Sequence, residues 1–240
     1  MADLIRSAKS GSDWTENDLH AYHIRVVYQD AATFFQIPGP GLPAPAVQHP
    51  AVLTLSGPAT ATDASVYQFL RTMDLAMLPV DAEESAVDDF AVLLLQELGY
   101  VPMCVSSTMA GFYFWCRRTN GTQMEENPVP QLVAEAIAAF HSNNVTREQT
   151  LGLPPLPSKV VPGITMKGTS PIFFKLPISQ ELVSAVIGGV YPATETIVQA
   201  HLPAIPRPAE RLNEGMKPQD NRLIIMSCYE AFKHVDEPLK

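Results

Sequence analysis

The sequence predicts a mixed α/β protein in which one large domain carries an N-terminal extension. The chain has 240 residues, a length that fits one large domain or a domain with an added lobe. Its composition, 46% hydrophobic and 17% charged, supplies enough apolar material for a core. Beyond residue 80, segments with a helical spacing of apolar residues alternate with short apolar runs typical of strands. We therefore place the extension at residues 1–62 and the α/β core at residues 63–240.

The first predicted element is a single amphipathic helix over residues 13–35. Asp13 can cap its N-terminus, and Glu16, three positions later, can answer the cap. The apolar face of this helix would consist of Leu19, Tyr22, Val26 and Val27. Such a helix is long enough to clasp the core or a second copy of the chain.

A proline-rich arm is predicted over residues 36–62. Six prolines lie between Pro38 and Pro58, and each of them lacks a backbone donor and opposes a continuous helix. We expect an extended segment that wraps the core. A second helix follows, from Asp63 to about Met77.

The core begins with a helix over residues 81–98, which Gly99 ends. Two short apolar runs, 101–105 and 112–116, flank a stretch of small residues and predict a β-hairpin. The remaining predicted elements are a helix over 128–144, hairpin strands over 160–166 and 172–178, a helix over 179–186 capped by Ser179, a strand over 196–202 and a helix over 220–234.

Charge and cysteine content narrow the expected partners and location. The formal net charge is −9, and the densest basic pair is Arg117-Arg118, so nucleic-acid binding through phosphates is disfavoured. Three cysteines without a CxxC pair indicate reduced thiols, and all three, Cys104, Cys116 and Cys228, are expected to be buried structural cysteines. The first residues contain no long apolar stretch, so we expect no signal peptide, and no apolar run reaches the ~20 residues of a membrane span. We expect an intracellular protein, cytoplasmic or nuclear, whose partner is a protein, with a homodimer among the expected states.

Sequence motifs for common chemistries are absent. The chain has no P-loop, GxGxxG, GxSxG or HExxH motif. His20 and His23 have a spacing that could hold a metal, but they lack a third ligand at suitable spacing. The sequence thus predicts no metal site and no cofactor.

The order of elements from residue 81 onward is close to the αβββαβ core of PD-(D/E)XK nucleases, short by one strand. In that restriction-endonuclease-like architecture, the hairpin strands present an acid and then an E-x-K set. The two carboxylates hold Mg²⁺, and the lysine helps to orient the attacking water.

Longer stretches of the chain resemble a fungal protein family with a PD-(D/E)XK-like core. The stretches are SGSDWTENDLHAYHIRVVYQDAATFF, PVPQLVAEAIAAFHSNN, VVPGITMKGTSPIFFKLPISQELVSAV and GMKPQDNRLIIMSCYEAFK, which together extend over most of the chain. The resemblance implies the nuclease-like fold and no particular activity. The chain departs from the family where chemistry would occur: the expected strand-starting Asp corresponds to about Pro102, and a Gln-Glu-Asp-Lys-like run corresponds to Cys116-Arg117-Arg118-Thr119.

The distribution of acidic residues also argues against a catalytic metal site. Glu97 is the only acid between Asp89 and Glu125, so the predicted hairpin carries no carboxylate. Because hard cations need oxygen ligands, we predict a degenerate, noncatalytic site and a role in binding or as a scaffold. The residues predicted to remain in the cleft are Glu84, Gln131, Glu135 and Lys175.

Two alternatives stay open at this point. The first is a nuclease with migrated ligands, in which Mg²⁺ or Mn²⁺ would be held by Glu84, Glu125, Glu126 and Glu135. The second is a small-molecule enzyme on a recruited fold, with a pocket formed by Phe112, Phe114, Trp115, Cys116 and Arg117.

Overall fold

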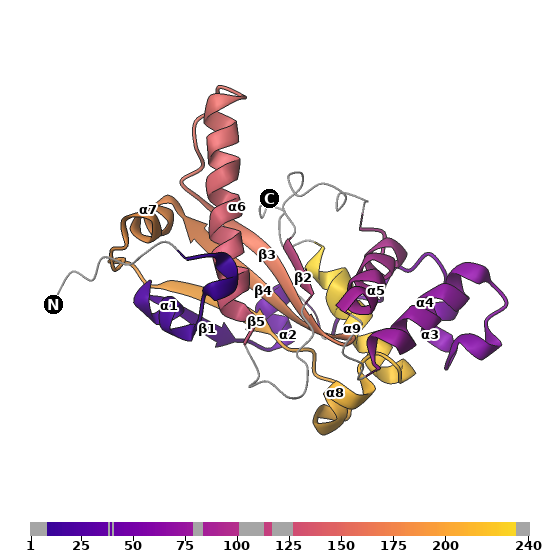
Figure 1. The fold of residues 1–240 in the computed structure, drawn as a ribbon. Coiled ribbons are helices and arrows are strands. Elements are labelled where there is room, and N and C mark those ends of the chain that lie inside the picture. Colours follow the sequence, from indigo (N-terminus) through magenta and orange to yellow (C-terminus); the bar gives the residue numbers. More distant parts are fainter. Residues whose placement is uncertain are drawn as a thin grey trace.

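The structure is a computed structural model that describes residues 9–37, 39, 41–78, 84–100, 113–116 and 127–233. Its centre is a mixed sheet of five strands in the order β1-β5-β4-β3-β2 (Figure 1). The central strands β3, β4 and β5 are antiparallel, whereas β1 runs parallel to β5 and β2 parallel to β3. This arrangement confirms the mixed α/β class. The strands are β1 Ile24–Tyr28, β2 Tyr113–Cys116, β3 Ser158–Lys167, β4 Ser170–Ser179 and β5 Thr196–His201.

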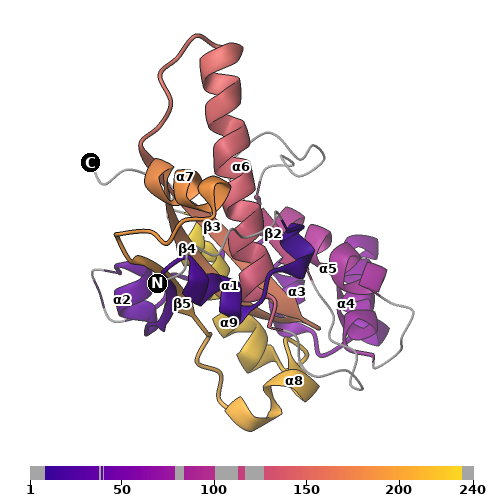
Figure 2. The ribbon, with the colours of Figure 1, turned by 60° about the vertical axis from the view of Figure 1, so that its left-hand side comes forward.

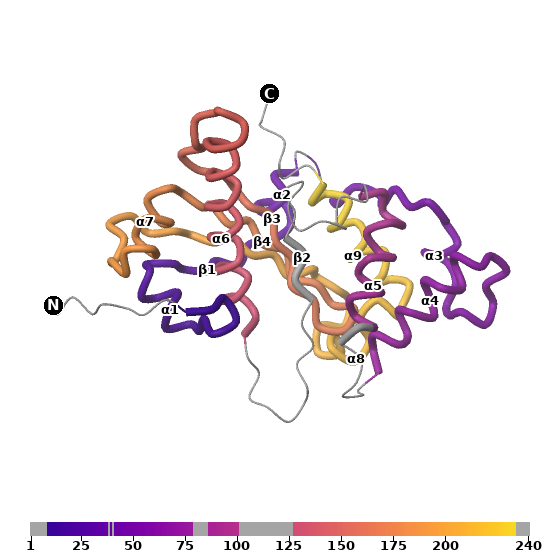
Figure 3. The backbone as a smooth tube through the Cα atoms, turned by 45° about the horizontal axis from the view of Figure 1, so that its top comes forward, coloured from indigo at the N-terminus to yellow at the C-terminus, as the bar shows by residue number. Residues whose placement is uncertain are grey.

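Helices cover both faces of the sheet (Figures 1 and 2). One face carries α1, α6 and α7, and the other carries α2, α4, α5 and α9, as the two hydrophobic clusters show. Figure 3 shows α4 and α5 at one end of the molecule and α1, β1 and α7 at the other. The helices are α1 Glu16–Ala21, α2 Ala31–Phe35, α3 Ala51–Thr54, α4 Ala64–Ala76, α5 Glu84–Glu97, α6 Val129–Gln149, α7 Gln180–Gly188, α8 Arg211–Glu214 and α9 Gln219–Phe232.

The alternation of side chains along β4 divides the core in two. Phe173 points to the cluster under α5 and α9, and Phe174 points to the cluster under α6 and α7. Gly163 on β3 lets α6 approach the sheet closely. A Cβ at this position would lie 2.9 Å from Leu176 Cδ1 and 3.1 Å from both methyl groups of Leu132.

The predicted helix over residues 13–35 is wrong. The segment forms a 3₁₀ turn (Gly11–Asp13), then α1, then strand β1, then α2. Thr15, not Asp13, precedes the first α-helix, and its backbone N–H and hydroxyl both donate to the Asp18 carboxylate at 2.9 Å. The N-terminal part is therefore woven into the sheet, where a helical clasp was expected.

The physical reason for this difference lies at residues 23–28. His23 adopts a positive φ of 53°, which ends the helical path. The next residues, Ile-Arg-Val-Val-Tyr, are mostly β-branched or aromatic and favour a strand. β1 then pairs in parallel with β5, with Ile24 opposite Thr196 and Tyr28 opposite Ala200. A distant partner strand thus overrides the local helical spacing.

The proline-rich arm follows the prediction in its described part. It is mostly extended, with only the short helix α3 and the 3₁₀ turn Pro58–Thr60. Its backbone is fastened to the end of α5, because Gln48 N–H donates to Glu97 C=O at 3.0 Å. Asp63 then caps α4, accepting bonds from the N–H groups of Ser65 and Val66 at 2.8 and 3.1 Å.

Most of the later elements are also confirmed. β3 and β4 form the predicted hairpin, and the Ser179 hydroxyl accepts the N–H of Leu182 at 3.1 Å at the start of α7. Helix α6 continues to Gln149, five residues beyond the predicted end, and its final turns project from the sheet (Figure 2). Of the predicted first hairpin, residues 101–105 lie outside the described residues, and β2 pairs in parallel with β3.

A buried arginine joins the C-terminal helix to the arm. Arg222 of α9 is 0% exposed, and burial lowers the pKa of its guanidinium to about 10. Two of its bonds reach the arm, at the carbonyls of Val52 and Leu55 (2.5 and 2.9 Å). The other two reach the carbonyls of Met216 and Lys217, at 3.0 and 2.8 Å.

Candidate functional site

Two of the residues predicted to remain in a nuclease-like cleft lie together on α6. The side-chain amide of Gln131 donates to Glu135 Oε1 at 3.3 Å. Gln131 is buried, and partial burial raises the pKa of the Glu135 carboxyl. The pair is thus a neutral donor beside a carboxylate that is partly removed from water.

Lys175 lies on the other face of the sheet. Its neighbours along β4, Phe174 and Leu176, point toward α6, so Lys175 points away from it. Its ammonium group donates to the carbonyl of Phe34 on α2 and lies 4.9 Å from the centre of the Phe34 ring. Burial lowers the pKa of Lys175. The structure does not bring this lysine together with Gln131 and Glu135.

Of the other predicted site residues, the structure describes some by their backbone alone and does not describe the rest. Glu84 is the first residue of α5, and Trp115 and Cys116 end β2, but the side chains of all three lie outside the described residues. Arg117, Phe112, Glu125 and Glu126 lie outside them entirely, and Phe114 is described only as part of β2. Within the described part of the chain, no group of three His, Cys, Asp or Glu residues is arranged to hold a metal ion.

Glu97, the acid nearest in sequence to the predicted hairpin, is fully engaged with the arm. It is 6% exposed and accepts the backbone N–H of His49 at 2.5 Å and its ring Nδ1 at 2.8 Å. This contact raises the pKa of His49. Glu97 therefore serves to anchor the arm.

A buried thiol–imidazole pair lies between α9 and β5. Cys228 Sγ is 3.8 Å from His201 Nε2, and His201 Nδ1 is 3.0 Å from the carbonyl of Gln29. Both side chains are almost completely buried, and burial raises the pKa of Cys228 to about 12. The thiol is protonated and enclosed, which confirms the expectation that Cys228 is a buried structural cysteine.

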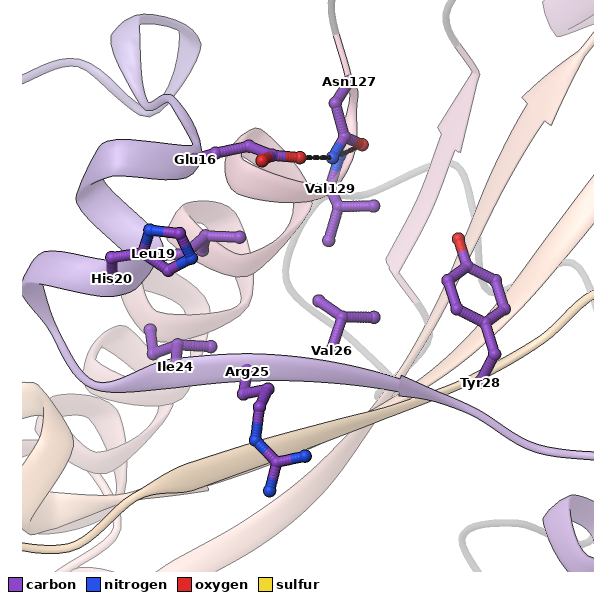
Figure 4. Close-up of a pocket in the computed structure, with 9 residues that line it drawn as sticks. All are labelled: Glu16, Leu19, His20, Ile24, Arg25, Val26, Tyr28, Asn127 and Val129. Atoms are coloured by element: carbon purple, nitrogen blue, oxygen red, sulfur yellow. Dashed lines mark hydrogen bonds between the residues drawn. The ribbon is translucent and has the colours of Figure 1, made fainter.

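A hollow lies beside β1, most of it in the segment that was predicted to be a helix. It is a cavity of about 350 Å³ between α1, β1 and the start of α6 (Figure 4). Its apolar lining is Leu19, Ile24, Val26 and Val129, and its polar lining is Glu16, His20, Arg25, Tyr28 and Asn127. We refer to these nine residues as the β1 groove.

The groove has two distinct ends and a fixed upper rim. Figure 4 shows Leu19, His20 and Ile24 at one end and the Tyr28 ring at the other. The rim is held by a 2.8 Å bond from the Asn127 amide to the Glu16 carboxylate. Tyr28 is 57% exposed, and the burial of its remaining surface raises the pKa of its phenol.

Arg25 contributes little charge to the groove. Its guanidinium turns away from the hollow (Figure 4) and forms two bonds with Glu195, at 2.8 and 2.9 Å. With Arg25 paired outside the hollow, the lining consists of apolar side chains, neutral hydrogen-bonding groups and the carboxylate of Glu16, which Asn127 holds at the rim.

The backbone of β1 offers further binding capacity. Gln29 N–H donates to Ala200 C=O, and His23 C=O accepts from Thr196 N–H, so the odd-numbered residues face β5. By the alternation of a strand, the N–H and C=O groups of Ile24, Val26 and Tyr28 face outward. Among the described residues, no hydrogen bond reaches these outward groups. β1 is thus an edge strand with a hollow above it.

No family model matches the chain, and no curated protein and no solved structure is significantly similar to it. Over the described residues, no helix combines the length and the apolar character that crossing a membrane requires.

Proposed function

We propose that the protein is a noncatalytic, PD-(D/E)XK-like protein that binds an extended protein segment along β1. The observation that carries the proposal is an edge strand whose outward backbone groups are unpaired within the described residues, beside a hollow of about 350 Å³. An added strand would gain main-chain hydrogen bonds from β1, and every second side chain would enter the hollow.

The nuclease-like part of the proposal is supported by the arrangement of the middle of the chain. Helices α5 and α6 pack on opposite faces of the sheet, and α6 connects the parallel neighbours β2 and β3. This order of helix, strand, crossover helix and strand agrees with the later part of the αβββαβ sequence of elements.

The noncatalytic part is supported by where the acids and the lysine lie. Residues 98–124 contain no Asp or Glu, and Glu97 is bonded to His49. Lys175 lies on the opposite face of the sheet from Glu135. The PD-(D/E)XK mechanism uses carboxylates and a lysine around one metal-dependent reaction centre, so these residues do not supply that mechanism.

A protein segment fits the groove better than a polyanion does. The formal net charge of the chain is −9, and Arg25 is already paired with Glu195. The hollow is lined by Leu19, Ile24 and Val26, which favour apolar side chains. Binding of a strand would also satisfy backbone groups that an edge otherwise leaves open.

The test is a selection from a displayed library of random linear peptides, with wild type as bait and Val26→Pro as counter-bait. Proline at position 26 removes an outward N–H and leaves the bonds to β5 in place. We expect peptides that wild type retains and Val26→Pro loses, and that slow amide exchange at Ile24, Val26 and Tyr28. Peptides that bind both chains equally, or that protect other residues, would contradict the proposal.

Catalysis is tested separately on the same sample. Titration calorimetry with Mn²⁺, followed by incubation with single- and double-stranded DNA and RNA, is expected to show neither binding heat nor cleavage. Manganese-dependent cleavage that disappears in Glu84→Ala or Glu135→Ala would establish migrated ligands and overturn the noncatalytic part.

A further inference from the structure

We propose that the segment bound along β1 is β1 of a second copy of the chain, so that two sheets join into one across a twofold axis. This inference rests on the proposed function, because it names the occupant of the same groove. Three features of β1 favour this occupant: the pairing register, the fit of Tyr28, and the charges along the strand.

The twofold axis allows only a few registers. Outward backbone groups belong to Ile24, Val26 and Tyr28, so antiparallel pairing must set even-numbered residues opposite one another. A register centred on Val26, the middle residue of β1, pairs the full strand. A register centred on Arg25 or on Val27 pairs only residues 24–26 or 26–28. The central register therefore forms the most hydrogen bonds.

In the central register, Tyr28 of one copy stands opposite Ile24 of the other. Side chains directly opposite on one face have Cβ atoms about 5 Å apart. Ile24, with Leu19 and His20, forms the end of the hollow that lies away from Tyr28 (Figure 4). Each Tyr28 ring would thus enter the hollow of the other copy. The protrusion and the hollow occupy the same strand at the spacing that a twofold interface requires.

The charges also favour this register. Centring on Arg25 would set two arginines directly opposite each other, which is unfavourable. In the central register Arg25 stands opposite Val27 of the other copy, and its charge is already balanced by Glu195. Proteins protect exposed edges with charged side chains, proline or bulges; β1 has no lysine and no proline, and its one charge, Arg25, is already paired with Glu195. An edge of this composition is suited to pairing.

The first test is sedimentation of the native full chain over a rising concentration series. We expect conversion of monomer to dimer, and Tyr28→Ala should raise the dissociation constant of the dimer by about ten- to a hundredfold. The matched control is Tyr67→Ala, on α4 on the opposite face of the sheet. Tyr67 is 50% exposed and Tyr28 57%, so both substitutions remove a similar exposed ring. Tyr67→Ala should leave the dissociation constant unchanged.

The second test concerns the register. Val26→Cys would place two thiols opposite each other at the axis, with Cα atoms about 5.5 Å apart, a separation that a disulfide accepts. Val27→Cys would place its thiols diagonally across the axis, with Cα atoms more than about 7 Å apart. Under mild oxidation with oxidised glutathione, we expect peptide mapping to find the cross-link at position 26 and none at position 27.

The outcomes of these tests separate the second copy as occupant from the proposed function itself. A chain that stays monomeric at all concentrations but binds selected peptides along β1 overturns the second copy as occupant and leaves the proposed function standing. A monomer that binds no such peptide contradicts both. A dimer that Tyr28→Ala does not weaken, or that cross-links equally at positions 26 and 27, places the contact elsewhere and overturns the inference.

Discussion

Two regions of the molecule treat their backbone polar groups in opposite ways. Around Arg222, one buried guanidinium donates to four carbonyls, two from the arm and two from the segment before α9. Along β1, the outward groups of Ile24, Val26 and Tyr28 have no partner among the described residues. The backbone groups around Arg222 are thus satisfied within the chain, and those along β1 are available to a partner.

The contacts of Arg222 stabilise the fold, whereas the outward backbone groups of β1 remain available to bind a partner. Burying a charge is costly, and Arg222 is tolerable only because its donors are satisfied. Val26 and Tyr28 are accessible to solvent, so water can satisfy their outward N–H and C=O groups until another strand replaces it. Stability and binding are thus assigned to different parts of the fold.

The largest loss of stability is expected from removing the guanidinium of Arg222. Arg222→Met removes the donors of four carbonyls, and each buried acceptor left without a partner costs about 1–3 kcal/mol, so we expect a loss of at least ~3 kcal/mol. The measurement is urea unfolding. Arg147→Met is the matched control, because among the described residues the Arg147 guanidinium donates to a single carbonyl, that of Pro154. It should cost under ~1 kcal/mol. Equal losses of unfolding free energy in the two variants would contradict a special contribution of Arg222 to stability.

A smaller loss of stability is expected from displacing α6, which forms one wall of the groove, away from the sheet. In Gly163→Ala, the new methyl group would meet Leu176 at 2.9 Å and Leu132 at 3.1 Å, so α6 must shift. Overpacking of this kind costs about 1–3 kcal/mol. Gly57→Ala, where nothing lies within 4 Å of the added Cβ, should change the unfolding free energy by less than ~0.5 kcal/mol.

Gly163→Ala should also weaken binding along β1, because Val129 and Asn127 line the groove at the start of the same helix. Peptide binding that survives a clear loss of stability would show that the groove does not depend on the seating of α6.

The smallest effect concerns pH and the fastening of the arm. Contact with Glu97 raises the pKa of His49 above its unfolded value of about 6.5, so its stabilisation is complete below that pH and fades as pH rises through the folded pKa. His49 is 35% exposed, so the contribution should stay below ~1 kcal/mol. The unfolding free energies of wild type and His49→Gln should differ more at about pH 5.5 than at about pH 8.5. The same difference at both pH values would exclude this contact as the cause.

The sequence predicted the elements whose signals are local. The hairpin of β3 and β4, the Ser179 cap and the extended proline arm follow from residues near one another in the chain. β1 was missed because its apolar spacing fits a helix, while its partner strand lies about 170 residues further on. The run Ile-Arg-Val-Val-Tyr was the signal that could have identified it.

The site was harder to predict than the fold. The β1 groove depends on β1 being a strand, so the error at residues 13–35 concealed it. The predicted cleft joined Lys175 to Gln131 and Glu135 because strand alternation does not say which face of the sheet a particular helix covers. Packing of α6 on the Phe174 side assigns Lys175 to the opposite face. Contacts between distant elements decide such questions.

Residue-resolved amide exchange along β1, at low and at high protein concentration, tests the central claim most directly. In the dilute chain, the amides of Val26 and Tyr28 should exchange quickly and those of Val27 and Gln29 slowly, because only the latter face β5. At high concentration, Val26 and Tyr28 should become protected as a second β1 pairs with the edge. Rapid exchange at every concentration, or equal protection of all four amides in the dilute chain, would contradict an open edge that a second copy closes.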